Sequence, residues 1–111
     1  MEFKILQSLP FAVTVCNKDA EIIYMNDKSV LTFLKNSEDS IIGKSLFDCH
    51  NENSVLKIKE LLNSGDTNTY TIEKNGVKKL IYQCPWYQNG EIAGLVEISI
   101  ILPDKIPHFI R

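Results

Sequence analysis

The chain has 111 residues, of which 44% are apolar and 23% charged, with 12 Lys and Arg against 14 Asp and Glu and a net charge of -2. A chain of this length buries roughly two thirds of the surface that its unfolded form exposes, which is enough for one core and excludes a multidomain protein. No run of like charges forms the basic patch expected of a protein that binds nucleic acid or an anionic membrane. Neither kind of partner is expected.

The sequence also bears on location and redox state. It has no apolar stretch near the roughly 18 residues that span a bilayer, and no signal peptide at its start, so we expect a cytoplasmic protein. Its 3 cysteines, Cys16, Cys49 and Cys84, fit neither a disulfide framework nor a Cys-x-x-Cys site. Free and mostly buried thiols are therefore predicted.

The N-terminal part is predicted to contain a leader and a hairpin. Residues 1–10 have apolar residues at helical spacing, and Pro10 limits that helix to one or two turns. Two β-rich runs follow, 12–16 and 21–25, and the polar turn residues between them indicate a β-hairpin.

Short helices are predicted next. Asn26 or Asp27 can cap a helix with one apolar face, and Asn36-Ser37 ends it and caps a single turn that ends at Gly43. Apolar residues then repeat at helical spacing over about 54–63, which is the clearest helix in the sequence.

The C-terminal half has the pattern of a three-stranded antiparallel meander. The dipeptides Asn75-Gly76 and Asn89-Gly90 each separate two β-favouring runs, and Asn-Gly is a strong signal for a tight hairpin turn. The tail after residue 102 contains two prolines and cannot continue a central strand, so we expect it to lie across the surface.

This order of elements resembles a PAS domain, as do the segments LPFAVTVCNKDAEIIYMN, Gly43-Lys44-Ser45 and GEIAGLVEISI. The resemblance implies an α+β fold, with a five-stranded antiparallel sheet and short helices packed on one face, over residues 11–102. PAS domains bind a small molecule between sheet and helices, or dimerise, and transmit the change to a partner. One departure is Ala20, which stands where the family usually has a turn glycine.

The known cofactor chemistries of the family have no matching residue here. Leu46 occupies the position of the reactive cysteine of flavin-binding members, so flavin-cysteinyl photochemistry is not expected. Ile58 occupies the position of the haem-ligating histidine, so haem would have to use His50 with a different geometry. The sequence therefore leaves the cofactor unknown.

The segment Phe47-Asp48-Cys49-His50 is the most distinctive candidate site. Imidazole is both a common metal ligand and a hydrogen-bonding group, so His50 could hold haem or a metal, or bind a polar ligand beside the cavity. The alternative is a histidine that is exposed or hydrogen-bonded and caps the following helix.

The last two predicted strands can be oriented in two ways. Alternation places one set of apolar residues on one face, and a simple interpretation turns this set into the core. The PAS resemblance instead turns the alternate residues toward the helices and the cavity, and these are Lys79, Ile81, Gln83, Leu95, Glu97 and Ser99. The apolar set is Leu80, Tyr82, Cys84, Trp86, Val96, Ile98 and Ile100.

The resemblance then implies two sets of candidate residues. Those for a ligand pocket are His50, Cys49, Phe47, Phe33, Ile58, Ile81, Gln83, Leu95, Glu97 and Ser99. Those for a dimer face are Phe3, Leu6, Leu80, Tyr82, Trp86, Val96, Ile98 and Ile100. An apolar face of several hundred Å² is rarely left exposed, so we expect the N-terminal segment or a second copy to cover it.

The sequence thus predicts a sensory or signal-transduction module that is not an enzyme, binds a small molecule, and acts through a homodimer or a signalling protein. A buried Glu97 would pair with His50, because a buried carboxylate needs a partner. Two alternatives stay open. One is a ligand-free interaction adaptor, and the other is a small enzyme in which His50 works with Asp48 or Glu97 as acid or base.

Overall fold

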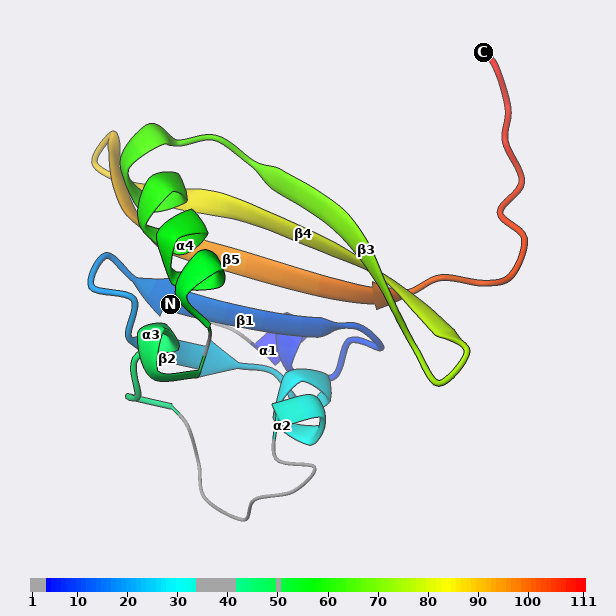
Figure 1. Cartoon of the computed structure of the whole chain (residues 1–111), viewed down its shortest axis with the longest axis horizontal. Coiled ribbons are helices and arrows are strands. Elements are labelled where there is room, and N and C mark those ends of the chain that lie inside the picture. Colours follow the sequence, from blue (N-terminus) through cyan, green and yellow to red (C-terminus); the bar gives the residue numbers. More distant parts are fainter. Residues whose placement is uncertain (1–3, 34–41, 50) are drawn as a thin grey trace.

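The structure, a computed structural model, describes residues 4–33, 42–49 and 51–111. A five-stranded antiparallel sheet with the order β2-β1-β5-β4-β3 forms its centre (Figure 1). The strands are β1 Ala12–Asn17, β2 Ile22–Met25, β3 Asn68–Lys74, β4 Val77–Gln88 and β5 Glu91–Ile101. The described helices are α1 Lys4–Gln7, α2 Asp27–Phe33, α3 Leu46–Cys49 and α4 Glu52–Ser64. The predicted α+β architecture is confirmed.

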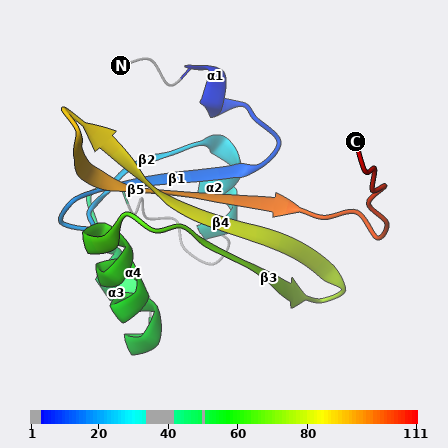
Figure 2. The same cartoon turned by 90° about the horizontal axis from the view of Figure 1, so that it is seen from above.

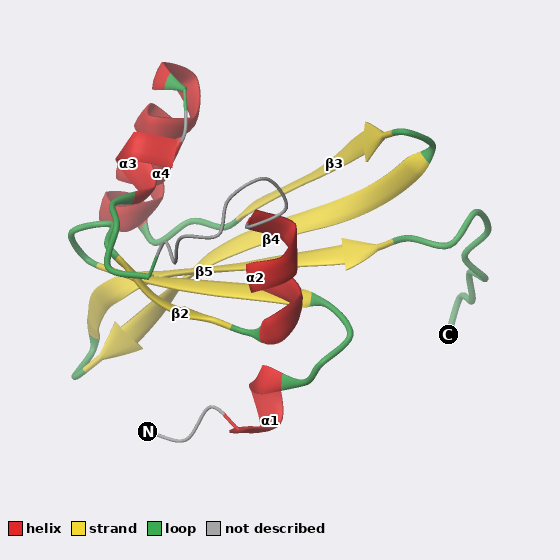
Figure 3. Cartoon of the chain, turned by 90° about the horizontal axis from the view of Figure 1, so that it is seen from below, coloured by secondary structure: helices red, strands yellow, loops and turns green. Residues whose placement is uncertain are grey.

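The helices are divided between the two faces of the sheet. Figures 2 and 3 show α2, α3 and α4 on one face, with α1 on the opposite side. We call the first the helix face and the second the outer face. Beyond β5 the C-terminal residues extend away from the sheet rather than across it, which differs from the sequence expectation (Figure 1). No helix in the described part of the chain is long and apolar enough to cross a membrane.

Helix α4 is longer than predicted because its cap lies earlier in the chain. The side chain of Asn51 accepts a hydrogen bond from the Ser54 amide at 2.9 Å, so Asn51 is the N-cap. The interpretation that His50 caps this helix is therefore wrong. Gly65 ends the helix with a left-handed φ of 78° and donates to the Leu61 carbonyl.

The two Asn-Gly dipeptides form the predicted hairpin turns. Asn75 and Gly76 have φ values of 54° and 78°, and Asn89 and Gly90 have 53° and 79°. Positive φ at both central residues belongs to the tight turn whose twist matches antiparallel strands. Ala20 also has a positive φ, 64°, so it adopts the conformation for which the family uses glycine.

Asn26 joins three parts of the fold. Its side chain is 0% exposed, and its Oδ1 accepts from the amides of Val13 in β1 and Ser29 in α2 at 2.9 and 3.1 Å. Its Nδ2 donates to the carbonyls of Leu6 and Phe11 at 3.0 and 2.8 Å. Asn26 is thus the cap of α2, as predicted, and it also attaches the N-terminal segment to the sheet.

The core shows which side of each strand faces the helices. Cys16 of β1 and Leu95 of β5 pair across the sheet and pack in one buried cluster with Ile58 and Leu61 of α4. Residues that pair directly lie on the same face, so alternation places Glu97 on the helix face as well. The simple interpretation that turned the apolar set into the core is wrong.

The apolar set forms the outer face. Leu80, Cys84, Trp86, Val96 and Ile98 are half-buried there. Tyr82 and Ile100 are 37% and 36% exposed.

Candidate functional site

A cavity of about 250 Å³ lies between α4 and the β3–β4 edge of the sheet. We call it the α4 cavity. It is lined by Asn53, Ser54, Lys57, Ile58, Asn68, Tyr70 and Gln83. The helix and the sheet therefore both supply polar groups to the α4 cavity, and Ile58 of α4 supplies an apolar side chain.

A second cavity of about 210 Å³ lies between α2 and the sheet, and we call it the α2 cavity. It is lined by Ala12, Thr14, Thr32, Tyr70, Ile72, Lys79, Ile81, Glu97 and Ser99. Tyr70 lines both cavities, and a small space of about 20 Å³ lies between them against Ile58, Gln83 and Glu97. The two cavities therefore meet in the middle of the helix face.

Three polar side chains form a hydrogen-bonded row at this meeting point. The Nδ2 of Asn68 lies 2.8 Å from the Oε1 of Gln83, and the Nε2 of Gln83 lies 2.8 Å from the Oε1 of Glu97. The pairing register aligns them, because Asn68 faces Gln83 and Gln83 faces Glu97 on adjacent strands. The row crosses β3, β4 and β5 in the direction of the strand hydrogen bonds.

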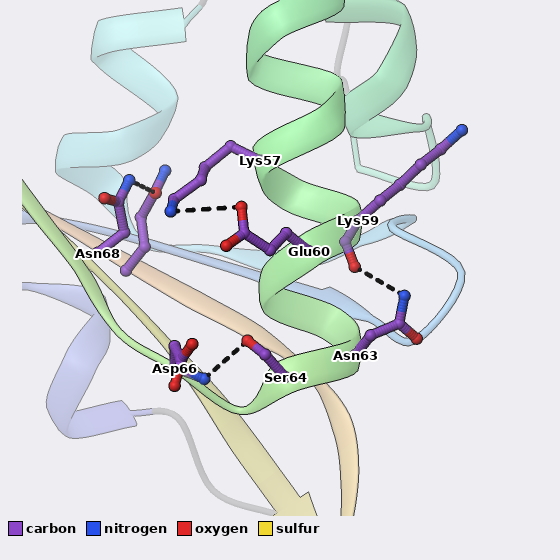
Figure 4. A network of polar contacts seen from close by, with 8 residues as sticks. Lys57, Lys59, Glu60, Asn63, Ser64, Asp66 and Asn68 are labelled. Atoms are coloured by element: carbon purple, nitrogen blue, oxygen red, sulfur yellow. Dashed lines mark hydrogen bonds and ion pairs between the residues drawn. The ribbon is translucent and has the colours of Figure 1, made fainter.

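The helix side of the α4 cavity is more open. Figure 4 shows Lys57 of α4 between Glu60 and the Asn68 side of the sheet. The Lys57 Nζ lies 3.5 Å from the Glu60 carboxylate, and the two side chains are 41% and 58% exposed. Exposed pairs of this kind contribute little to stability, so Lys57 remains able to rearrange around a bound molecule.

Burial changes the acidity of several groups near the cavities. Burial, and then the charge of Glu97, raises the pKa of Tyr70, so its phenol stays protonated at neutral pH. Burial also raises the pKa of the Cys16 and Cys84 thiols, both of which are free cysteines. These two thiols are accordingly weak nucleophiles, as expected of structural cysteines.

The structure brings six of the predicted pocket residues together. Ile58 and Gln83 line the α4 cavity, Ile81, Glu97 and Ser99 line the α2 cavity, and Leu95 lines the small space between them. Glu97 is hydrogen-bonded to Gln83, whereas its predicted partner His50 lies outside the described residues.

The remaining predicted pocket residues are not part of this arrangement. Phe47 packs against the edge of the core, and its ring centroid lies 5.2 Å from the Lys59 Nζ, away from both cavities. Cys49 and Phe33 belong to α3 and α2, but their side chains lie outside the described part of the structure. Among the described residues, no group of three His, Cys, Asp or Glu is arranged to hold a metal ion.

Sequence reasoning missed several residues of the site, and a signal was present for two of them, Asn68 and Tyr70. Asn75-Gly76 forms a two-residue turn, and such a turn places Tyr70 opposite Ile81 and Asn68 opposite Gln83. Thr14 of β1 and Thr32 of α2 both line the α2 cavity, and they come together only because α2 packs on β1. That packing is a tertiary feature with no short-range signal.

Comparison with known proteins identifies the fold. No protein-family profile matches the sequence, and no curated protein matches it either. Among solved structures, the PAS domain of BvgS from Bordetella pertussis is 15% identical, with a TM-score of 0.63 over 92% of this chain and 84% of that chain. The chain has the PAS fold.

Two other solved structures are also similar to this chain. A C-terminal domain from Streptococcus mutans is 24% identical, with a TM-score of 0.69 over 88% of this chain and 80% of that chain. VqmA from Vibrio cholerae, described as a dimer and a LuxR-type receptor, is 15% identical, with a TM-score of 0.70 over 92% of this chain and 50% of that chain. The chain thus spans about half of VqmA, of which another structure is described as bound to DPO.

These similar structures include the PAS domains of histidine kinases and of a receptor. At 13–14% identity, the similarity to these proteins establishes the fold.

Proposed function

We propose that this PAS module senses a small molecule bound between α2, α4 and the sheet, and signals by changing its association with a second copy of itself. The observation that carries the proposal is the pair of cavities that share Tyr70, with Glu97 lining the α2 cavity and the small space beside it. Ligand sites are concave and combine apolar side chains with convergent polar groups, and this region places Gln83 and Glu97 beside Ile81. A cytoplasmic location stays a prediction from the sequence.

The volumes favour a small ligand. The cavities measure about 250 and 210 Å³, below the roughly 300 to 1,000 Å³ of sites that hold drug-sized molecules. A compact metabolite therefore fits either cavity, and a somewhat longer one can use both through the space beside Glu97.

A cavity-filling substitution tests ligand binding. Ser99 lines the α2 cavity, so in Ser99→Leu the added methyl groups occupy the space and displace a bound molecule. Thr71→Leu is the matched control, because Thr71 is exposed on the opposite face of β3. Mass spectrometry of denatured extracts should find a small molecule with the wild type and Thr71→Leu, and lose it with Ser99→Leu. Retention by Ser99→Leu would show that the molecule binds outside the α2 cavity, and empty extracts from all three proteins would favour the ligand-free adaptor.

The outer face is the proposed surface for the second copy. Helix α1 is attached to the β2 and α2 end, where Gln7 bonds Tyr24 and Asp27, and so leaves the apolar residues of β4 and β5 half-exposed. Of the dimer-face candidates, Leu6 is half-buried in α1, and Phe3 lies outside the described residues. A two-fold dimer would cover the same patch on both copies.

A charged substitution tests this dimer. Ile98→Asp places a carboxylate in the middle of the outer face, and we expect it to convert a dimer into a monomer in light scattering at tens of micromolar. Leu56→Asp is the control, because Leu56 is 64% exposed on α4 and lines neither cavity. A wild-type protein that is monomeric under these conditions would refute the dimer, as would an Ile98→Asp protein that remains dimeric.

A further inference from the structure

The hydrogen-bonded row across the sheet has a defined direction. An ionised carboxylate only accepts hydrogen bonds, so Gln83 must donate its Nε2–H to Glu97. The Oε1 of Gln83 is then the atom that accepts from the Nδ2 of Asn68. The charge of Glu97 thereby determines the orientation of both amides.

This direction leaves acceptors for a ligand. The second carboxylate oxygen of Glu97 has no hydrogen-bond partner among the described residues, and neither has the Oδ1 of Asn68. Glu97 lines the α2 cavity and Asn68 lines the α4 cavity. Each cavity therefore presents an oxygen acceptor from the sheet.

Glu97 is also a half-buried carboxylate with no cationic partner among the residues that the structure describes. Lys57–Glu60 is the ion pair formed among the described residues, and it does not include Glu97. Charges removed from water are normally paired, and here the compensation comes from the neutral amide of Gln83. The charge of Glu97 extends far enough to raise the pKa of Tyr70, which lines both cavities.

The positive groups nearest to the cavities lie at their ends. Lys79 lines the α2 cavity but stands four positions before Gln83 in β4, roughly 13 Å along the strand. Lys57 lines the α4 cavity, and its Nζ lies 3.5 Å from the Glu60 carboxylate and is not paired with Glu97. Neither lysine neutralises Glu97, so the place where the cavities meet favours positive charge.

We infer that the ligand is a small organic cation or strong N–H donor, such as an amine, an amidine or a protonated nitrogen heterocycle, whose N–H groups bind the free oxygen of Glu97. It lies in the cleft that the α2 and α4 cavities form together. The inference rests on the proposed sensing function and adds the ligand class to it. The apolar part of the ligand lies against Ile58, Ile81 and the ring of Tyr70.

Three probes of nearly the same shape test this assignment: benzamidine, benzamide and benzoate, which are cationic, neutral and anionic. Each is titrated to about 10 mM into the labelled protein, a concentration at which a ligand with a Kd near 1 mM is mostly bound. Amide shifts in β1, β4 and β5 report binding at the cleft. We expect benzamidine to bind at least about tenfold more tightly than benzamide, and benzoate not to bind.

Two variants identify the recognising group. Glu97→Gln keeps the size of the side chain and should weaken benzamidine by about tenfold while leaving benzamide unchanged. Glu73→Gln, at an exposed position on the outer face of β3, should leave all three probes unchanged. Benzoate binding as tightly as benzamidine in the wild type, or an unchanged benzamidine affinity in Glu97→Gln, would overturn the ligand class and leave small-molecule sensing intact. No cleft shifts with any probe would overturn both.

Discussion

Replacing Asn26 by Asp is expected to lower the free energy of unfolding by about 3–5 kcal/mol, a large part of the stability of a small domain. The substitution keeps the shape of a side chain that is 0% exposed but removes both donors, so the carbonyls of Leu6 and Phe11 lose their partners. It also places a carboxylate in a fully buried position. Denaturant titration followed by the fluorescence of Trp86, the 1 tryptophan of the chain, measures the change.

Asn63→Asp provides the control for Asn26→Asp. Asn63 is exposed on α4 and its Nδ2 donates one hydrogen bond, to the Lys59 carbonyl at 3.1 Å. Losing this bond at a solvated position should cost less than about 1 kcal/mol. If the two variants were equally stable, Asn26 would not be the residue that joins the N-terminal segment, β1 and α2.

Gly94→Ala is expected to destabilise the chain by about 3 kcal/mol or more, because the position has no room for a methyl group. A Cβ at Gly94 would lie 1.9 Å from the Cys16 carbonyl oxygen and 2.6 Å from the Trp86 Nε1. The Trp86 indole crosses this glycine to donate to the same carbonyl at 2.9 Å. The added methyl would therefore separate β1 from β5 and displace the indole, and the emission of Trp86 should shift to longer wavelength.

Gly76→Ala separates crowding from backbone strain. Gly76 has a φ of 78° and no heavy atom within 4 Å of the place for a Cβ, so alanine there meets strain alone. This strain should cost about 1 kcal/mol. A Gly94→Ala protein as stable as Gly76→Ala would contradict the close approach of Trp86 to the sheet.

Local signals in the sequence predicted much of the fold. Asn75-Gly76 and Asn89-Gly90 specify turns through the backbone conformations that they permit, and both turns are present. The longest helix was found from the spacing of Ile58 and its apolar neighbours, although its start was displaced because Asn51 supplies the cap.

The orientation of β4 and β5 could not be predicted from alternation. Both sides of these strands carry residues that favour burial, and the side that received the helices includes the polar residues Gln83 and Glu97. A half-buried polar row appears as an exposed face when only hydropathy is considered, and the PAS resemblance supplied the correct orientation. The site itself depended on β3, because Asn68 becomes a pocket residue only through its pairing with Gln83.

The central claim is that the cleft between the helices and the sheet holds a small molecule. A crystal structure of the chain purified from cells, without added ligand, tests it most directly. We expect continuous density that is not protein between Tyr70 and Glu97, with a donor atom against the free carboxylate oxygen of Glu97. A cleft closed by its own side chains, with Tyr70 packed against Glu97 and no remaining space, would contradict the account.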